Sequence, residues 1–241
     1  MTSVGEMPSS TAASSMLESL LMIEVWHGTL GNVPDSVTTL KTYDAAVRGL
    51  RRQLAALPPG TPVRLAKRTS NLFRGRSEAR PLLDVSAFAG VLSVDAGFAE
   101  VLGMTTYEDL VDATLATGQL PLVVPQLKTI TLGGAVAGVG IESSSFRNGT
   151  PHESVVEMDI LTGDGQVVTC SRSQNADLFY GFPNSYGTLG YALRLRIELE
   201  PVKPFVHLEH VRCSSVAEAV SHMRAPAADF CDGVWFSPDE V

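Results

Sequence analysis

Hydrophobic residues recur at steps of three and four between residues 40 and 57, which predicts an amphipathic helix. Arg51 and Arg52 fall on its polar side. The sequence Pro58-Pro59-Gly60 ends the helix, because proline cannot continue it and glycine favours a turn. The apolar residues at 62–67 then predict a short buried strand. The apolar face of the helix consists of Leu40, Tyr43, Val47, Leu50, Leu54 and Leu57.

Two strands are predicted next, at 82–94 and 97–103, and a second helix follows them. Thr105 lies three residues before Glu108, which is the spacing of a capping box at a helix start. Gly118 ends this helix, and residues 121–125 predict another strand. The apolar positions of the helix are Tyr107, Leu110, Val111 and Leu115.

The second half of the chain alternates apolar and polar residues, as strands of an antiparallel sheet do. Residues 155–170 predict a hairpin whose turn is Asp164-Gly165, and residues 174–182 predict a short helix. Residues 191–200 predict a half-buried strand. After Pro201 and Pro204, residues 206–241 predict a strand, a helix and a strand that begin a further unit. The buried face of the strand at 191–200 is expected to carry Tyr191, Leu193, Leu195, Ile197 and Leu199.

Composition narrows the class of protein. The chain has 241 residues, 44% of them hydrophobic, which suits one large domain or two small ones. Its net charge of −8 argues against a nucleic-acid partner or a general affinity for anionic membranes. The cysteines Cys170, Cys213 and Cys231 show neither a disulfide pattern nor metal-ligand spacing.

The N-terminus shows no targeting signal. Residues 1–20 are expected to be flexible, and the apolar run at 20–26 is too short to span a bilayer. We therefore expect a cytoplasmic protein without an integral membrane segment.

The stretch from Thr131 to Ser154 is rich in glycine and serine, at positions 133, 134, 138, 140 and 149 and at Ser143–Ser145. Glycine lets the backbone approach a ligand closely, and free N–H groups beside hydroxyls suit phosphate oxygens. A Walker A loop is excluded, because no lysine follows a glycine pair. A Rossmann fingerprint starting at Gly138 would place Ser143 where the third glycine belongs. The Rossmann fingerprint is therefore disfavoured, and a third possibility, a flavin pyrophosphate loop of a different fold, is supported by resemblance to a known family.

Three segments, residues 130–149, 157–168 and 175–201, resemble the vanillyl-alcohol-oxidase or p-cresol-methylhydroxylase (PCMH) type of FAD-binding oxidoreductases. Within that family, the sequence Gly-Ile-Glu-Ser-Ser-Ser at 140–145 and the spacing from Asp177 to Gly190 are most similar to Δ24-sterol reductases. They also resemble actinobacterial FAD enzymes that act on lipid double bonds. The resemblance covers residues 35–205.

The resemblance implies an α+β fold. Residues 21–205 would form a two-lobed PCMH-type FAD-binding domain, and residues 206–241 the start of an incomplete substrate (cap) domain. FAD would lie between a small lobe of strands and helix and a lobe built on an antiparallel sheet. The cofactor-binding residues implied are Arg68, Thr69, Ser70, Asn71, Leu72, Thr131, Leu132, Gly133, Gly134, Gly138, Gly140, Ile141, Glu142, Ser143, Ser144 and Gly190.

Many members of this family attach FAD covalently through a histidine in the first loop. Residues 67–76 contain neither histidine nor cysteine, so we expect non-covalent FAD. The resemblance further implies that a lipid carbon–carbon double bond is reduced, in a sterol side chain or a methylene-branched fatty acyl chain, with NAD(P)H as co-substrate. A lipid substrate also allows peripheral contact with a membrane. Two alternatives are an FAD-dependent alcohol oxidase or dehydrogenase of the same fold and a non-catalytic FAD-binding fragment.

Several polar residues admit two interpretations each. The basic cluster could face the FAD diphosphate or form a solvated loop. Glu142 could tune the isoalloxazine or cap a turn, and His152 could donate a proton or make a surface hydrogen bond. No catalytic residue is assigned. The basic cluster consists of Lys67, Arg68, Arg74, Arg76 and Arg80.

Overall fold

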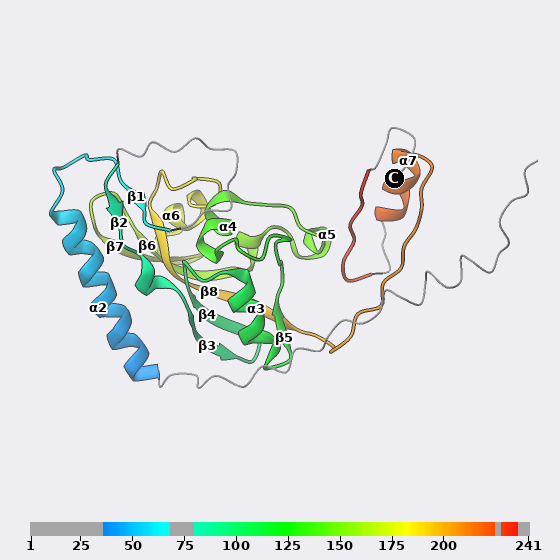
Figure 1. The fold of residues 1–241 in the computed structure, drawn as a ribbon, viewed down its shortest axis with the longest axis horizontal. Helices are drawn as coiled ribbons and strands as arrows, with labels where there is room; N and C mark the ends of the chain where they lie inside the picture. Colours follow the sequence, from blue (N-terminus) through cyan, green and yellow to red (C-terminus); the bar gives the residue numbers. More distant parts are fainter. Residues whose placement is uncertain (1–35, 68–79, 225–227, 236–241) are drawn as a thin grey trace, which may run out of the picture. The chain divides into compact units, whose positions relative to one another are not determined.

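The computed structural model describes residues 36–67, 80–224 and 228–235, with side chains from residue 41 onward (Figure 1). The first of the chain's two units, Met1–Gly31, lies outside the described residues. The expectation of a flexible segment at 1–20 therefore also falls outside them. Every described helix and strand belongs to the second unit, Asn32–Val241.

An antiparallel sheet is the centre of the described part of the chain. Its strand order is β3-β4-β8-β6-β7, and β5 pairs separately with β8. Two further short strands, β1 (Arg64–Leu65) and β2 (Leu82–Leu83), form a parallel pair. The predicted α+β class is confirmed. The strands of the sheet are β3 (Val91–Asp95), β4 (Phe98–Leu102), β5 (Gln119–Pro121), β6 (Val155–Leu161), β7 (Val167–Ser171) and β8 (Tyr191–Pro201).

Helices pack against this sheet through two separate apolar clusters. Helix α2 (Ser36–Ala55) contributes Leu50 to one cluster, together with Leu83, Phe88 and Leu193. Helices α3 (Tyr107–Leu115), α4 (Leu132–Gly138) and α6 (Ala176–Gly181) contribute to the larger cluster, whose sheet residues include Ile197. In Figure 1, α2 lies along one side of the sheet, away from α3 and α4. The remaining helical elements are η1 (Ser86–Phe88), α5 (Ser145–Asn148), η2 (Pro151–Ser154) and α7 (Val216–Met223).

Four sequence predictions in the first half need correction. The strand predicted at 82–94 is interrupted, because the 3-10 turn η1 separates β2 from β3 and buries Phe88. Helix α3 is capped by Thr106, whose hydroxyl accepts from Asp109 N at 3.2 Å, and not by Thr105. Thr105 is buried and donates to the carbonyl of Leu102. The strand predicted at 62–67 is reduced to β1, and the strand predicted at 121–125 is misplaced, because β5 (Gln119–Pro121) shares only Pro121 with it.

Strand β8 also departs from its predicted alternation. The pairing with β6 shifts between Asp159 and Ile160, so that Arg194 and Ala192 are successive partners and Leu193 is the extra residue of a bulge. Leu193 therefore joins the cluster around α2, whereas Leu195 and Ile197 join the cluster on the other face. The expectation that all five apolar residues share one face is wrong.

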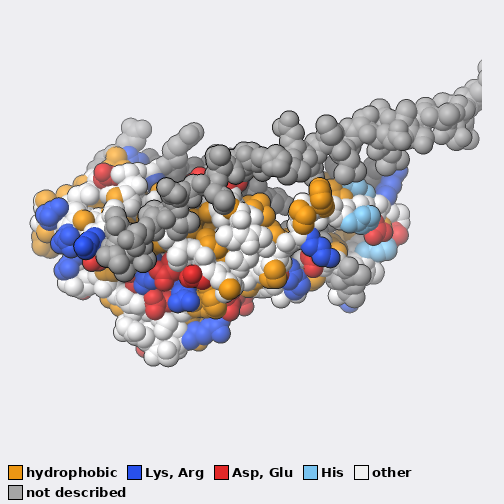
Figure 2. All heavy atoms as spheres, turned by 90° about the horizontal axis from the view of Figure 1, so that it is seen from below, with side chains coloured by type: hydrophobic (Ala, Val, Ile, Leu, Met, Phe, Trp, Pro, Cys, Tyr) orange, Lys and Arg blue, Asp and Glu red, His pale blue; other side chains and the backbone are white. Residues whose placement is uncertain are grey.

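The hairpin and the short helix of the second half are confirmed. β6 and β7 pair across a turn in which Gly165 has a φ of +80°. The described residues from 206 to 235 contain helix α7, but the strands predicted on either side of it are not formed. On the face of the molecule in Figure 2, acidic and basic side chains are interspersed and not separated by sign.

Candidate functional site

The glycine-rich stretch folds as a helix, a turn and a second short helix. Leu132 and Val136 anchor α4 in the core, which offsets the low helix propensity of its three glycines. The start of the helix is bound to the sheet, because Leu132 N donates to Thr105 O and Gly133 N donates to Gly103 O, both at 2.9 Å. The stretch that the sequence predicted as ligand-binding backbone therefore begins as a packed helix.

Gly133 is required by the protein's own backbone. A Cβ at Gly133 would lie 2.8 Å from Gly103 O, and a Cβ at Gly103 would lie 2.0 Å from Ala192 O. These distances are shorter than van der Waals contact, so only glycine fits at either position. Three chain segments thus cross in contact where α4 begins, beside the β8 bulge.

Gly134 differs from its neighbours because it is exposed between buried Gly133 and Ala135. A Cβ at this position would lie 2.9 Å from Thr131 Oγ1 and 3.7 Å from Lys67 Nζ. Lys67 Nζ itself donates to Thr131 Oγ1 at 2.7 Å. The glycine thus leaves room beside a lysine and a threonine that come from distant parts of the sequence.

Lys67, Thr131 and Gly134 line a cleft of about 520 Å³. The cleft walls come mainly from residues 125–142 and 182–192, and they are largely apolar or glycine. Lys67 and Glu142 are the charged side chains among the described lining residues. The predicted site residues that line the cleft are Thr131, Gly133, Gly134, Gly138, Gly140, Glu142 and Gly190.

The other predicted site residues lie elsewhere. Leu132 is buried in the core, and Ser144 is buried with its hydroxyl donating to Leu122 O at 2.8 Å. Ile141 is 86% exposed and lies outside the cleft lining. Ser143 is half-buried, and its carbonyl accepts from Cys231 N at 2.8 Å. Arg68, Thr69, Ser70, Asn71 and Leu72 lie outside the described residues.

Two cleft residues have unusual backbone conformations that the sequence does not signal. Val139 ends α4 with a φ of +58° and a ψ of 141°, a region that β-branched residues rarely adopt. Tyr186 has a φ of +50°, and its N–H donates to Ala137 O at 3.0 Å. Each such residue costs about 1–3 kcal/mol and persists only where surrounding contacts impose it. Both residues belong to the cleft wall at the end of α4.

The hydrogen bonds of Glu142 agree with the interpretation that it caps a turn, and Glu142 also lines the cleft. Its Oε2 accepts from Gln126 N at 3.2 Å, and its own N–H donates to Ser145 Oγ at 2.9 Å. Burial raises the pKa of the Glu142 carboxyl, and Asp232 adds to the effect, while the Gln126 hydrogen bond opposes it. The carboxyl is therefore easier to protonate than an ordinary glutamate.

His152 does not line the cleft. Its Nδ1 lies 2.8 Å from Thr150 Oγ1, within the capped turn η2. Glu153 completes that turn by accepting from Thr150 N at 2.7 Å. These contacts agree with the interpretation of His152 as a hydrogen-bonded turn residue.

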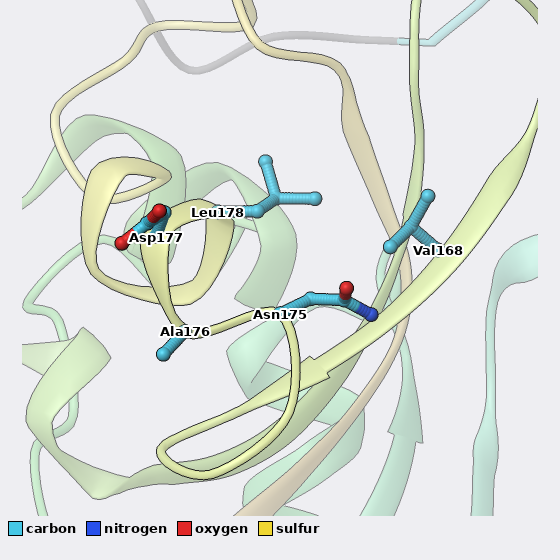
Figure 3. A pocket seen from close by; sticks show the side chains of 5 residues that line it. All are labelled: Val168, Asn175, Ala176, Asp177 and Leu178. Carbon is cyan, nitrogen blue, oxygen red and sulfur yellow. The ribbon is translucent and has the colours of Figure 1, made fainter.

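A second, smaller hollow of about 360 Å³ lies between β7 and α6 (Figure 3). Asn175 uses its side-chain amide to donate to Thr169 O at 2.8 Å. Val168, Ala176 and Leu178 supply apolar lining, and Asp177 is the charged residue. The hollow contains none of the predicted site residues, so the cleft beside α4 is the candidate site.

Metal and membrane features can be assessed for the described residues only. Within them, no group of three or more His, Cys, Asp or Glu side chains is placed to hold a metal ion. No helix in the same part of the chain has the length and apolarity needed to cross a membrane. Cys170, Cys213 and Cys231 are all free thiols.

Sequence comparison with known proteins identifies one family. Residues 38–171 match the FAD binding domain family. This range contains Lys67 and the whole glycine-rich stretch up to Ser154.

Individual relatives fall into two groups. Δ24-sterol reductase of Rattus norvegicus is 37% identical over 123 residues, which cover 49% of this chain and 24% of the reductase. Cytokinin dehydrogenase 7 of Oryza sativa is 35% identical over 145 residues, covering 60% of this chain and 26% of that enzyme. Cytokinin dehydrogenase 4 of Arabidopsis thaliana is 29% identical over 190 residues, covering 78% of this chain and 34% of that enzyme. The chain thus spans between about a quarter and a third of the length of these relatives.

Proposed function

The chain belongs to the family of PCMH-type FAD-binding domains, and we propose from this that it binds FAD in the cleft beside α4 and serves as an FAD-dependent oxidoreductase. The observation that carries the proposal is the coincidence of two independent features. The stretch that resembles the family's phosphate-binding segment also forms one wall of the cleft of about 520 Å³.

The residues present suit this cofactor. Among the described residues, the N–H groups of Gly134 and Gly140 have no hydrogen-bond partner, and both glycines line the cleft. Such donors suit phosphate oxygens. The apolar lining, which includes Leu65, Met104 and Phe182, suits a flat aromatic ring system. Residues 68–72 are proposed to complete the site from the first loop.

We propose non-covalent attachment. Residues 67–76 contain no histidine or cysteine that could form a bond to the flavin. The proposed FAD-binding domain is residues 21–205, and the proposed cap domain begins at 206. The chain's own residues would bind and orient the cofactor and exclude water from it.

The reaction proposed is the reduction of a carbon–carbon double bond in a lipid, either a sterol side chain or a methylene-branched fatty acyl chain. When bound, FAD supplies hydride relay between a reduced nicotinamide and the double bond. The net reaction consumes one NAD(P)H and one proton for each double bond reduced. Support comes from the similarity to Δ24-sterol reductases and from the apolar character of the cleft.

A second candidate is an FAD-dependent alcohol oxidase or dehydrogenase of the same fold. It is supported by cytokinin dehydrogenases 7 and 4, which match 60% and 78% of this chain, whereas the sterol reductase of Rattus norvegicus matches 49%. The same fold serves both reactions, since fold alone does not determine function. The third candidate is a chain that binds FAD without activity of its own.

One series of measurements tests these candidates. Purified protein should show a flavin absorbance spectrum, and acid precipitation should release all the yellow colour into solution. Anaerobic NADPH or NADH should bleach the flavin, and a lipid alkene should restore the colour. Bleaching by an alcohol, with peroxide formed in air, would instead support the second candidate. A protein that neither contains nor takes up FAD would refute the proposal.

A further inference from the structure

A segment near the C-terminal end of the described chain, residues 229–233, is bound to the glycine-rich stretch. We call this segment the strap. Cys231 N donates to Ser143 O at 2.8 Å, and Cys231 is half-buried while the other four residues of the strap are exposed. Ser143 directly follows Glu142, which lines the cleft. The strap is therefore attached at the edge of the cleft wall.

The strap carries two acidic residues whose electrostatic surroundings are opposite. Hydrogen bonds to Glu200 are the main reason why the pKa of Arg147 is raised, and the charge of Asp229 adds to this effect. Asp232 instead acts on a carboxyl, because its charge opposes the ionisation of Glu142. Opposite charges attract and like charges repel. One end of the strap is therefore attracted to the glycine-rich stretch, and the other end is repelled by it.

Glu142 cannot easily turn away from Asp232. Its side chain is half-buried, and its Oε2 accepts from Gln126 N at 3.2 Å. Burial raises the pKa of Glu142, the Gln126 hydrogen bond opposes this, and the Asp232 charge adds to the rise. On α3, burial and then the Glu142 charge raise the pKa of Tyr107, so this phenol stays neutral. The charge that acts on Glu142 thus comes from the strap.

Docking of the strap and protonation of Glu142 are therefore coupled. A docked strap holds Asp232 near Glu142 and favours the protonated form, whereas a released strap removes that influence. By linkage, a proton on Glu142 favours docking by the same factor. This contribution to docking is fully present below the ordinary glutamate pKa of about 4.3. It is lost as the pH rises through the raised pKa of the docked state.

We propose that residues 229–233 form a pH-sensitive strap at the edge of the cleft, docked through Cys231 N and Ser143 O and weakened when Glu142 and Asp232 are both charged. The position of the strap then sets the charge inside the cleft, because Glu142 is more often neutral when the strap is docked. A cleft ligand that prefers one charge state of Glu142 shifts the strap as well. The proposal does not depend on which ligand occupies the cleft.

Hydrogen exchange of the Cys231 N–H on the full chain tests the docking directly. Dividing the measured rate by the intrinsic rate of an unprotected amide at each pH gives a protection factor, which reports the opening equilibrium. The range from about pH 5 to about pH 8 covers the loss of the proton from a carboxyl with a raised pKa. The proteins compared are the wild type, Glu142→Gln, Asp232→Asn and Asp229→Asn. Melting temperatures show whether each variant is folded.

Asp229→Asn is the matched control, because it removes the same charge from the other end of the same strap. In the wild type, Cys231 protection should fall about two- to fivefold from pH 5 to pH 8, the range of one exposed charge pair. Asp232→Asn should raise the protection at pH 8 by a similar factor and remove most of the pH dependence. Asp229→Asn should lower the protection at every pH and keep the pH dependence.

Glu142→Gln should have the same effect as Asp232→Asn, and it decides the question if Asp232→Asn fails to fold. The glutamine side chain still offers an oxygen to Gln126 N, so the turn is kept.

Three results would overturn the proposal. The first is equal wild-type protection at pH 5 and pH 8, and the second is a change of the same sign in Asp232→Asn and Asp229→Asn. The third is an unprotected Cys231 N–H at every pH, which would show that the strap is not docked. None of these results bears on FAD binding, which the absorbance spectrum tests separately.

Discussion

Adjacent glycines at the start of α4 have different roles, although their sequence contexts look alike. Gly133 is buried and avoids the carbonyl of Gly103, whereas Gly134 is exposed in the cleft. A substitution at Gly133 is therefore expected to disturb packing. A substitution at Gly134 is expected to disturb ligand binding.

Gly134→Val should abolish flavin binding and leave the fold largely intact. The branched side chain would fill the space beside Thr131 Oγ1 and Lys67 Nζ, where the diphosphate is proposed to lie. Flavin content per protein is measured by absorbance, and folding by circular dichroism. Gly133→Val is the matched comparison and should unfold at a lower temperature. Yellow Gly134→Val protein with full FAD occupancy would contradict the site assignment.

Asp159 is the acceptor of a buried network that links α2 to the sheet. It is 5% exposed and accepts from Tyr43 Oη at 2.8 Å, Thr169 Oγ1 at 2.7 Å and Arg194 Nε at 2.9 Å. Burial alone would raise the pKa of Asp159, but the hydrogen bonds from Arg194, Thr169 and Tyr43 together lower it. Burial, then the Asp159 charge, raises the pKa of Tyr43, so the phenol remains the donor.

Because the folded pKa of Asp159 is lowered, its contribution to stability is present above the unfolded pKa of about 3.9 and is lost as the pH falls through the folded value. Asp159→Asn should therefore cost about 1–3 kcal/mol at pH 7, and less as the pH falls below 4. Urea unfolding at several pH values measures this difference. A constant difference between pH 7 and pH 2 would contradict the assignment.

At the scale of elements, the sequence predicted whether a segment is a helix or a strand better than it predicted caps and bulges. The alternation at 191–200 predicts a strand, but the bulge at Leu193 depends on the partner strand and on Gly103, which no local pattern contains. Thr105 and Thr106 both suit a helix cap. The choice between them depends on the burial of Thr105 against Leu102 O and Gly90 O.

The sequence also predicted the candidate site only in part. The glycine-rich stretch does line the cleft. Glycine allows another group to approach the backbone closely, whether that group is a ligand or another part of the chain. The sequence could not separate Gly133, which approaches backbone, from Gly134, which faces the cleft. It also could not indicate the strained conformations of Val139 and Tyr186, which result from tertiary contacts.

The contact between β4 and the β8 bulge should be highly sensitive to added volume. A Cβ at Gly103 would lie 2.0 Å from Ala192 O, and backbone cannot yield as a flexible side chain does. Gly103→Ala should therefore lower the free energy of unfolding by about 3 kcal/mol, the upper range for overpacking. Urea unfolding monitored by circular dichroism provides the measurement.

Gly163→Ala is the control for that experiment. Nothing lies within 4 Å of its Cβ position, and its backbone is not left-handed. This variant should stay within about 0.5 kcal/mol of the wild type. Equal stability of Gly103→Ala and Gly163→Ala would show that the two strands do not touch as closely as the structure has them.

At the scale of the whole molecule, exposed apolar side chains concentrate toward the C-terminal end of the described chain. Isolated exposed apolar residues are common, but a dense group of them marks a surface that another element covers. Residues 206–241 are proposed to begin a second domain, and these side chains would belong to its core. The exposed residues are Phe205, Val206, Leu208, Val211, Val216, Val220, Met223, Phe230, Val234 and Trp235.

A chain that ends at Pro204 should therefore lose much of its exposed apolar surface and keep its cofactor site. The described cleft lining lies entirely between Leu65 and Ala192, and all the strands of the main sheet precede Val202. The shortened chain should bind the dye ANS less strongly than the full chain while its FAD affinity is retained. A full-length control carries Phe230→Ser and Trp235→Ser, so it loses apolar surface without losing length. This variant should also bind ANS less strongly than the wild type. If truncation abolishes FAD binding while the double substitution leaves it intact, residues 205–241 are part of the cofactor-binding unit and the proposed boundary at 206 is wrong.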